Sequence, residues 1–424
     1  MPEANKPSGW NPIPLAAIFR INTTAAFPAQ SPNEFFTHYS IPAFDKLGGP
    51  ASESGSSIES SKTSILEPSV LVSKLNPRKP RVVAVLKPQD RTCCSTEFIC
   101  YVPLRKCDDL RYWSAYFGSG EFSRRLERVA VGSTNSHTRV SPSETLKWLV
   151  PDVPAGEQKL IADIFDAIDD AILETDATIE KLRTVLVGII DDLLTRGLTD
   201  DGSPREISSV IKTEVGPRPA KWTVANLGHF VVDAEYGTNL SLGDSSAGIP
   251  VLRMNNIQDG EFDLTDLKYA PAHAVDRLRL QRNDVLFNRT NSWEHVGKAA
   301  IWRRDEPGPA FASYLVRLHC GDALLPEFLH LWLNWAPVQR AIRQFATPGV
   351  QQVNINPTNL RRALIAVPDT LDEQRAIIDR VNGVAAAIEV HRREHAKLSN
   401  LREGLRDDLL TGRKPVVAIR EAAE

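Results

Sequence analysis

The sequence lacks any apolar run near the roughly 20 residues that a membrane-spanning helix requires. Residues Met1–Trp10 also lack the apolar core of a signal peptide. The five cysteines are an odd number and form no Cys-x-x-Cys pair, so a disulfide framework is not indicated. We therefore expect a soluble protein in a reduced, cytoplasmic location.

Motifs of common enzymes are missing as well. There is no Walker phosphate loop, so any use of ATP would belong to a partner, and there is no Asn-Pro-Pro-Tyr or Asp-Pro-Pro-Tyr motif. Asp152, Glu157 and Lys159 imitate the spacing of a nuclease motif, but they lie at a predicted helix entry instead of on a sheet. Phe117-Gly-Ser-Gly-Glu imitates a glycine loop, but it follows a helix-like run, so we expect a turn between helices. We predict no catalytic site and no cofactor.

The most informative feature that is present is an internal repeat. Residues 157–195 and 373–411 align without a gap at an offset of 216, and fourteen of the 39 positions are identical. This offset is about half the chain and far exceeds the roughly 20–50 residues of a solenoid repeat. The sequence therefore predicts a duplicated half-molecule with two-fold pseudo-symmetry.

Each repeat predicts a long helix, because apolar residues recur at alternating steps of three and four. At 1.5 Å per residue such a helix is roughly 58 Å long, which favours a coiled coil over a helix packed in a globular core. We expect the two helices to pack antiparallel, with the globular domains at opposite ends. The pairing we expect is Ile161 facing Leu409, Leu193 facing Ile377, Thr175 opposite His395 and Ile179 opposite His391.

Two alternatives apply to these helices. They could be unrelated helices of two tandem domains. His391 and His395 have the i,i+4 spacing of metal ligands, but no third ligand is near in the sequence, so we interpret them as polar seam positions and predict no metal site.

Charge is unevenly distributed along the chain. The net charge of −3 by itself argues against a nucleic-acid-binding protein. However, Lys and Arg outnumber Asp and Glu by 18 to 13 in residues 1–149, whereas residues 150–198 hold 4 against 11. Residues 221–362 are nearly balanced, at 15 against 14. An acidic helix thus masks a basic first domain.

The two non-helical segments resemble each other more distantly. Each opens with a Trp, at Trp10 and Trp222, and continues with short strands, a pair of helices and a polar loop that ends in a proline, which predicts an α+β fold for both. We expect short strands at 39–44, 69–76, 248–253 and 283–291, and a flexible surface loop at 48–64. The predicted boundaries are globular domains at 1–149 and 221–366, a central long helix at 150–198, a linker at 199–220, a C-terminal long helix at 367–414 and a tail at 415–424.

Several short segments, together with the order of globular part, helix, globular part and helix, carry a resemblance to a known family. They are Tyr39–Asp45, Val72–Arg78, Ser95–Phe98, Gly248–Arg253, Pro357–Leu360, and the Val-Pro-Asp and Glu-Gln pairs at 150–158 and 367–374. Through them the whole chain resembles the specificity subunit of a type I restriction–modification enzyme. The resemblance implies two target-recognition domains, each reading one half of a split double-stranded DNA site. It also implies that the helices act as a spacer and dock two methyltransferase subunits, with restriction/translocase subunits joining later.

Base edges are read by Arg, Asn and Gln, and phosphates attract Lys, Arg, Ser and Thr. Such residues cluster at matching places in both halves. The candidate DNA-binding residues are Ser73, Lys74, Asn76, Arg78, Lys79, Arg81, Asn135 and His137 in the first half, and Arg253, Asn255, Asn288, Arg289, Asn291, Gln351, Gln352 and Asn354 in the second. Polar clusters of this kind are also ordinary in solvated loops. A rival reading is a coiled-coil interaction protein that presents two ligand-binding globules without DNA.

Overall fold

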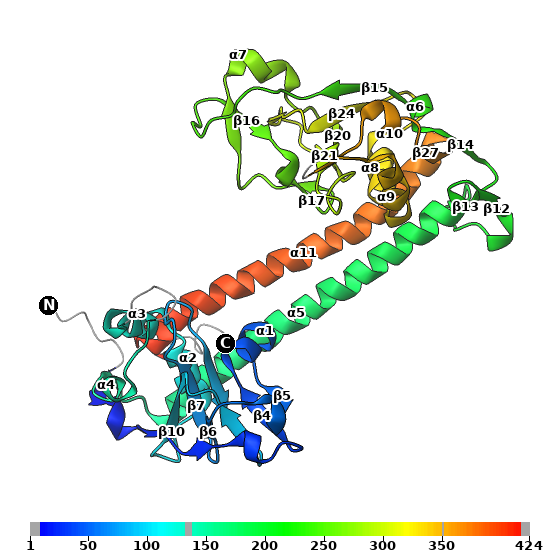
Figure 1. The fold of residues 1–424 in the computed structure, drawn as a ribbon. Coiled ribbons are helices and arrows are strands. Elements are labelled where there is room, and N and C mark those ends of the chain that lie inside the picture. Colours follow the sequence, from blue (N-terminus) through cyan, green and yellow to red (C-terminus); the bar gives the residue numbers. More distant parts are fainter. Residues whose placement is uncertain (1–8, 132–137, 350–351, 417–424) are drawn as a thin grey trace. The chain divides into compact units, whose positions relative to one another are not determined.

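The computed structural model describes residues 9–131, 138–349 and 352–416 (Figure 1). The chain divides into two compact units: unit 1 holds Met1–Ala177 and Arg393–Glu424, and unit 2 holds Thr178–Arg392. Both units mix helices with short strands, as the α+β prediction requires. The two long helices, α5 (Ala155–Arg196) and α11 (Leu371–Leu410), each contribute one part to either unit.

Unit 1 is built on two sheets. One is antiparallel with the order β2-β10-β7-β8, and the other has the order β3-β6-β9-β4-β5, in which β4 and β9 run parallel. A separate pair joins β1 to β11. The strands are β1 (Pro12–Pro14), β2 (Phe19–Asn22), β3 (Ala25–Ala26), β4 (Phe35–Tyr39), β5 (Ala51–Ser54), β6 (Lys62–Ser64), β7 (Ser69–Ser73), β8 (Val82–Val85), β9 (Thr92–Cys94), β10 (Phe98–Pro103) and β11 (Leu149–Pro151). The shorter helices are α1 (Ile41–Leu47), α2 (Leu110–Phe117), α3 (Gly120–Val129) and α4 (Pro142–Thr145).

Aromatic side chains fill the core between the antiparallel sheet and the helices of unit 1. Strand β7 is buried along its whole length, and Trp113 and Phe117 of α2 pack against Phe19 of β2. The side chains of Asp109 and Ser119 accept backbone hydrogen bonds at the starts of α2 and α3. The expected turn between two helices at Gly118 and Ser119 is therefore correct.

Two expectations for unit 1 were wrong. Residues 39–44 were expected to be a strand, but the strand ends at Tyr39 and α1 begins at Ile41. The side chain of Ser40 accepts the backbone N–H of Ala43 and so caps the start of α1, and a proline such as Pro42 is tolerated in a first helical turn. Residues 48–64 were expected to be a loop, yet they contain β5 and β6. Their serine-rich sequence has no hydrophobic alternation because β5 is an edge strand.

Unit 2 contains an antiparallel sheet with the order β15-β24-β20-β22 and smaller sheets β19-β16-β23, β21-β26-β25, β14-β27, β12-β13 and β17-β18. The strands are β12 (Val210–Thr213), β13 (Gly216–Pro219), β14 (Trp222–Asn226), β15 (Val231–Tyr236), β16 (Ile249–Leu252), β17 (Ile257–Gln258), β18 (Glu261–Phe262), β19 (Lys268–Ala270), β20 (Val285–Asn288), β21 (Thr290–Asn291), β22 (Ala299–Ile301), β23 (Ala310–Phe311), β24 (Leu315–Cys320), β25 (Thr347–Pro348), β26 (Val353–Asn354) and β27 (Leu364–Pro368). The shorter helices are α6 (Leu227–Phe230), α7 (Ala272–Val275), α8 (Pro326–Asn334), α9 (Ala336–Ile342) and α10 (Pro357–Leu360).

The two units repeat one topology. The order β2-β10-β7-β8 of unit 1 corresponds, strand for strand, to β15-β24-β20-β22 of unit 2. The parallel pair β4·β9 corresponds to β16·β23, and the pair β1·β11 to β14·β27. The helices α2 and α3 correspond to α8 and α9, whose starts are displaced by the same 216 residues that separate the long helices. The duplication inferred from the helices therefore extends into both globular parts.

Repeated side chains make repeated contacts at the start of each long helix. Gln158 and Gln374 are both fully buried. The Oε1 atom of Gln158 accepts the backbone N–H of Asp109, and that of Gln374 accepts the N–H of Leu325, both at 2.9 Å. The Nε2 atom of each donates to a carbonyl just before its own helix. Each glutamine thus ties the entry of a long helix to the segment that precedes α2 or α8.

Inside each unit, the parts of α5 and α11 share a core. In unit 1, Ile161 and Leu409 belong to one hydrophobic cluster, and in unit 2 Leu193 and Ile377 belong to another. In unit 1, Arg402 forms a bidentate ion pair with Asp169, and Nε2 of His395 lies 3.4 Å from Oδ1 of Asp176. From Asp169 to Asp176 the residue number on α5 increases, whereas that of the partner on α11 decreases from Arg402 to His395. The two segments of this unit therefore run antiparallel.

The segment expected to be a linker, 199–220, carries the hairpin β12-β13. Within unit 2, Arg218 of β13 is buried, with its guanidinium 4.5 Å from the ring centre of Trp335 and 5.3 Å from that of Trp332. Burial lowers the pKa of Arg218 to about 10. Its Nη2 atom donates to the carbonyl of Val215 at 2.6 Å. These contacts attach the hairpin to the helices α8 and α9.

Candidate nucleic-acid interface

In unit 2, polar residues that are far apart in the sequence converge on Met254, which follows β16. The carbonyl of Met254 accepts hydrogen bonds from Nδ2 of Asn288 at 3.0 Å and Nδ2 of Asn291 at 3.4 Å. The Nε2 atom of Gln352 donates to the sulfur of Met254 at 3.8 Å. Three of the predicted polar segments therefore meet in one place, although the sequence separates Met254 from Gln352 by about a hundred residues.

Arg289, between β20 and β21, is held in this cluster from three sides. Its Nη2 donates to Oδ1 of Asn354 at 3.1 Å, and its Nη1 donates to the carbonyl of Ser313 at 3.2 Å. Its guanidinium carbon lies 5.2 Å from the ring centre of Tyr236, which is a cation–π distance. Asn354 is itself fixed, because its Nδ2 donates to Oγ1 of Thr290 at 3.0 Å. A guanidinium has five N–H groups and two are used in these bonds, so donors remain at both Nη atoms.

In the loop after β16, Asn256 is buried and supports the backbone, whereas the neighbouring Asn255 is exposed. Arg253 pairs with Asp266 at 2.7 Å, and the buried side chain of Asn256 bonds to the backbone of Arg253, Asp263 and Asp266. These contacts close the loop on itself. Asn255 between them is exposed, and its side chain makes no hydrogen bond to a described residue.

In unit 1, the end of β7 lies beside the end of the second predicted polar loop. The N–H of Asn76 donates to the carbonyl of Thr138 at 3.0 Å, and the N–H of Val140 donates to the carbonyl of Lys74 at 3.2 Å. The same juxtaposition occurs in unit 2, where β21 pairs with β26. The two polar segments predicted in each half are therefore adjacent in both units.

Three of the candidate residues are buried, and their side chains serve the fold. Ser73 donates to the carbonyl of Leu75 at 2.9 Å, and Asn288 supports Met254. Arg81 forms a bidentate pair with Asp45, with distances of 2.8 and 2.9 Å. The hydrogen bond from Arg81 is the main reason why the pKa of Asp45 lies well below its usual range. Polarity in a sequence does not distinguish a buried polar group from an exposed one, so the sequence placed these three side chains among the candidates together with accessible residues.

Other candidates of the first half remain accessible. Arg78 and Lys79 are exposed, and Lys74 and Asn76 are partly exposed. Lys79 places its Nζ 3.0 Å from Asp45 while 60% of its side chain stays exposed. The candidates Asn135, His137 and Gln351 lie outside the described residues.

Some residues of these surfaces were missed from the sequence. Tyr236 supports Arg289 across 53 residues of chain, and no local pattern connects the two. Arg124 and Arg128 of α3 line a hollow together with Arg78 and Thr138. Arg124 could have been found from the sequence, because the offset of 216 residues aligns it with another arginine, Arg340 of α9.

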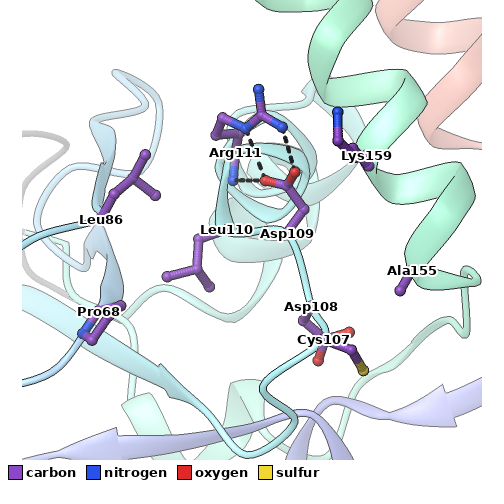
Figure 2. A pocket seen from close by; sticks show the side chains of 9 residues that line it. All are labelled: Pro68, Leu86, Cys107, Asp108, Asp109, Leu110, Arg111, Ala155 and Lys159. Atoms are coloured by element: carbon purple, nitrogen blue, oxygen red, sulfur yellow. Dashed lines mark hydrogen bonds and ion pairs between the residues drawn. The ribbon is translucent and has the colours of Figure 1, made fainter.

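A second hollow of unit 1, of about 390 Å³, lies where α2 and α5 begin (Figure 2). Figure 2 shows the guanidinium of Arg111 bonded to the carboxylate of Asp109. Arg111 also pairs with Asp163 and Asp166, and Lys159 pairs with Asp163. Each cation of this hollow is therefore already neutralised by carboxylates, so the hollow offers little attraction for an anion.

The residues that imitate a nuclease motif do not form a carboxylate site. Asp152 pairs with Arg105 at 2.7 Å, and Glu157 accepts the indole N–H of Trp10 at 3.3 Å. The corresponding Glu373 accepts the indole N–H of Trp222 at 2.9 Å. The contact between Glu157 and Trp10 thus recurs in unit 2 as that between Glu373 and Trp222, and Asp152 is held in an ion pair. In the described part of the chain, no group of three or more His, Cys, Asp or Glu is arranged to hold a metal ion.

No helix within residues 9–131, 138–349 and 352–416 is long and apolar enough to cross a membrane.

Comparisons with known proteins give one consistent result, although no family model matches the sequence. The chain is 24% identical over 275 residues to the type I restriction enzyme EcoBI specificity subunit of Escherichia coli. This alignment covers 62% of this chain and 56% of that protein. It is 24% identical over 294 residues to the type I restriction enzyme MjaVIII specificity subunit of Methanocaldococcus jannaschii. That alignment covers 68% of this chain and 67% of the relative. With a further relative from the same archaeon, the match at 27% identity covers only 48% of the relative. The chain thus spans about half the length of several curated relatives.

Solved structures agree in fold. A chain from a structure that describes complex assembly and conformational transition of a type I restriction–modification system superposes with a TM-score of 0.62 at 16% identity, covering 96% of this chain and 99% of that one. The specificity subunit of a type I system from M. genitalium gives a TM-score of 0.56 at 11% identity, with coverage of 96% and 98%. The resemblance predicted from the sequence is confirmed: this chain is similar to the specificity subunits of type I restriction–modification enzymes.

Proposed function

We propose that this chain is the non-catalytic, sequence-specific DNA-recognition subunit of a cytoplasmic type I restriction–modification complex. Unit 1 and unit 2 would each present one target-recognition domain, at 1–149 and 221–366, and each domain would read one half of a bipartite double-stranded DNA site. The paired long helices would form an antiparallel coiled coil that fixes the distance between the half-sites. They would also dock two methyltransferase subunits, with restriction/translocase subunits joining that assembly.

The observation that carries this proposal is the recurrence of polar surface clusters at corresponding strand ends of a duplicated topology. In unit 1 the cluster follows β7 and adjoins Thr138. In unit 2 it follows β20 and adjoins β26. The strand order and the buried glutamine contacts recur in both units, whereas the clusters differ in chemistry. Two similar frames with different surface chemistry are suited to reading two different short sequences.

The candidate residues divide into supports and DNA contacts. The buried Ser73, Arg81 and Asn288 support the surface. The accessible basic residues Lys74, Arg78 and Lys79 are proposed to contact phosphates, because ammonium and guanidinium groups attract them without base preference. The proposed base readers, whose side chains match the edges of guanine and adenine, are Asn76, Asn255, Arg289, Asn291, Gln352 and Asn354.

A binding experiment tests the proposal. The full chain, alone and co-expressed with a methyltransferase encoded beside it, is mixed at moderate salt with fragments of genomic DNA. A fragment that is retained preferentially, and whose selected sequences align as two short blocks with a fixed gap, supports the proposal. Absence of DNA binding even with the methyltransferase favours the rival reading, an interaction protein that presents two ligand-binding globules.

A further inference from the structure

A hollow of about 380 Å³ opens in unit 1 between the loop after β7 and helix α3. Arg78 lines the hollow from the loop, Arg124 and Arg128 line it from α3, and Thr138 lines it as well. One carboxylate, that of Glu127, also lines the hollow. The lining residues thus include three arginines and one glutamate, so the lining carries a net positive charge.

These three arginines have no carboxylate partner among the described residues. Arg20, Arg91 and Arg139 are exposed as well, but each forms an ion pair. Arg78, Arg124 and Arg128 are all exposed and form no such pair in the described part of the chain. Unpaired guanidinium groups at a concave surface attract an anion, and a phosphate fits their fork of N–H donors.

The hollow also adjoins the surface that is proposed to face DNA. Thr138, which lines the hollow, accepts the backbone N–H of Asn76 with its carbonyl oxygen. The hollow is therefore next to the polar loop that follows β7. At the offset of 216 residues, Arg124 corresponds to Arg340, but Arg128 corresponds to the uncharged Gln344. The full set of three arginines is therefore a property of unit 1, and it agrees with the excess of basic residues in this half.

We propose that Arg78, Arg124 and Arg128 form a seat for the phosphodiester backbone of DNA, and that this seat positions the first half-site without reading its sequence. This inference rests on the proposed function, since it names how unit 1 holds the same DNA. The hydroxyl of Thr138 donates to a phosphate oxygen in this arrangement. Within unit 1 the seat thus supplies salt-sensitive affinity, whereas the proposed base reader of this half-site stays Asn76.

The test measures how DNA binding depends on salt. The variants Arg78→Gln, Arg124→Gln and Arg128→Gln are prepared in the full chain with its methyltransferase subunits, and binding to the selected DNA fragment is measured between about 50 and 200 mM salt. Each variant is expected to reduce the slope of log K against log[salt] by about 0.9, the value for one phosphate contact. The base preference at both half-sites should stay unchanged.

Two further variants complete the design. Lys87→Gln removes one positive charge from an exposed residue that does not line the hollow, so its slope should equal that of the wild type. Glu127→Gln removes the only carboxylate that lines the hollow among the described residues, so it should strengthen binding. Slopes of the three arginine variants equal to that of Lys87→Gln would overturn the seat, and so would weaker binding by Glu127→Gln or a changed base preference. A wild-type complex that binds no DNA would instead overturn the proposed function itself.

Discussion

Replacing Arg289 with Ala should relax base preference at the second half-site and leave the first unchanged. Arg289 is held by Asn354, by the carbonyl of Ser313 and by the ring of Tyr236. These contacts fix the guanidinium before DNA arrives, so little side-chain entropy is lost on binding. The remaining N–H groups at Nη1 and Nη2 can make a bidentate contact to guanine.

The magnitude follows from this geometry. A bidentate contact to a base is worth about 1–3 kcal/mol of discrimination. At about 1.4 kcal/mol for each factor of ten, the preference at one base pair should fall by about 5- to 150-fold. Asn354→Ala removes one of the supports of Arg289 and should weaken the preference at the same base pair by less. From the sequence alone, Gln351→Ala is expected to act at this half-site too.

The assay is binding or methylation across two DNA libraries, in each of which one half-site is randomised. Arg289→Lys keeps the charge but loses the fork, so it should retain affinity for DNA and lose discrimination. Arg282→Ala is the matched control, because Arg282 is an exposed arginine of the same unit that pairs with Asp305. If Arg289→Ala alters both half-sites equally, or neither of them, the assignment of one unit to one half-site is refuted.

Four further outcomes are expected. Gln374→Ala should destabilise the chain by about 1–3 kcal/mol, measured by urea unfolding, because it leaves the N–H of Leu325 without its partner. A change below about 0.5 kcal/mol would contradict a structural role of Gln374. Burial opposes the ionisation of Glu373, but hydrogen bonds from Arg205, Leu198 and Trp222 outweigh it and lower its pKa below the ordinary 4.5. The stability that Glu373 contributes is therefore present above about pH 4.5 and is lost as pH falls through the lower folded pKa, and Glu373→Gln should flatten this loss in unfolding curves measured at stepwise lower pH. Lys74→Ala or Lys79→Ala should weaken binding at the first half-site in a salt-dependent manner, and equal weakening at all salt concentrations would argue against phosphate contacts. The purified chain alone should neither methylate nor cut DNA, and it should be poorly soluble because apolar side chains meant for partners stay exposed; either activity in a pure sample would contradict the proposal.

The sequence predicted the elements whose signal is periodic or duplicated. The long helices were recognisable because apolar side chains recur over about forty residues, and the structure gives them as Ala155–Arg196 and Leu371–Leu410. The pair of helices in each globular part was predicted from their common order in the two halves. Short polar elements carry no comparable signal. The edge strand β5 was missed for this reason, and α1 was missed because a single capping serine decides its start.

The surface clusters were predicted as residue types but not as geometry. The sequence placed Arg289 and Asn354 in separate polar loops, and only the pairing of β21 with β26 brings them together. It could not separate the supporting Arg81 from the exposed Lys79 two residues earlier. Both side chains pair with Asp45 from another part of the fold, but that of Arg81 is only 7% exposed whereas that of Lys79 is 60% exposed. Non-local contacts of this kind decide which polar groups are free to bind.

The comparison of the two units explains why interiors and surfaces diverged differently. The contacts repeated between units involve buried polar groups, such as Gln158 and Gln374, and losing a partner there costs about 1–3 kcal/mol. Changes among exposed side chains usually cost less than about 0.5 kcal/mol. The interior of a duplicated domain is therefore constrained by stability, whereas its surface is free to change for another target. Arginines that line a hollow in unit 1 and amides that surround Met254 in unit 2 are the outcome expected when one frame is used to hold two different half-sites.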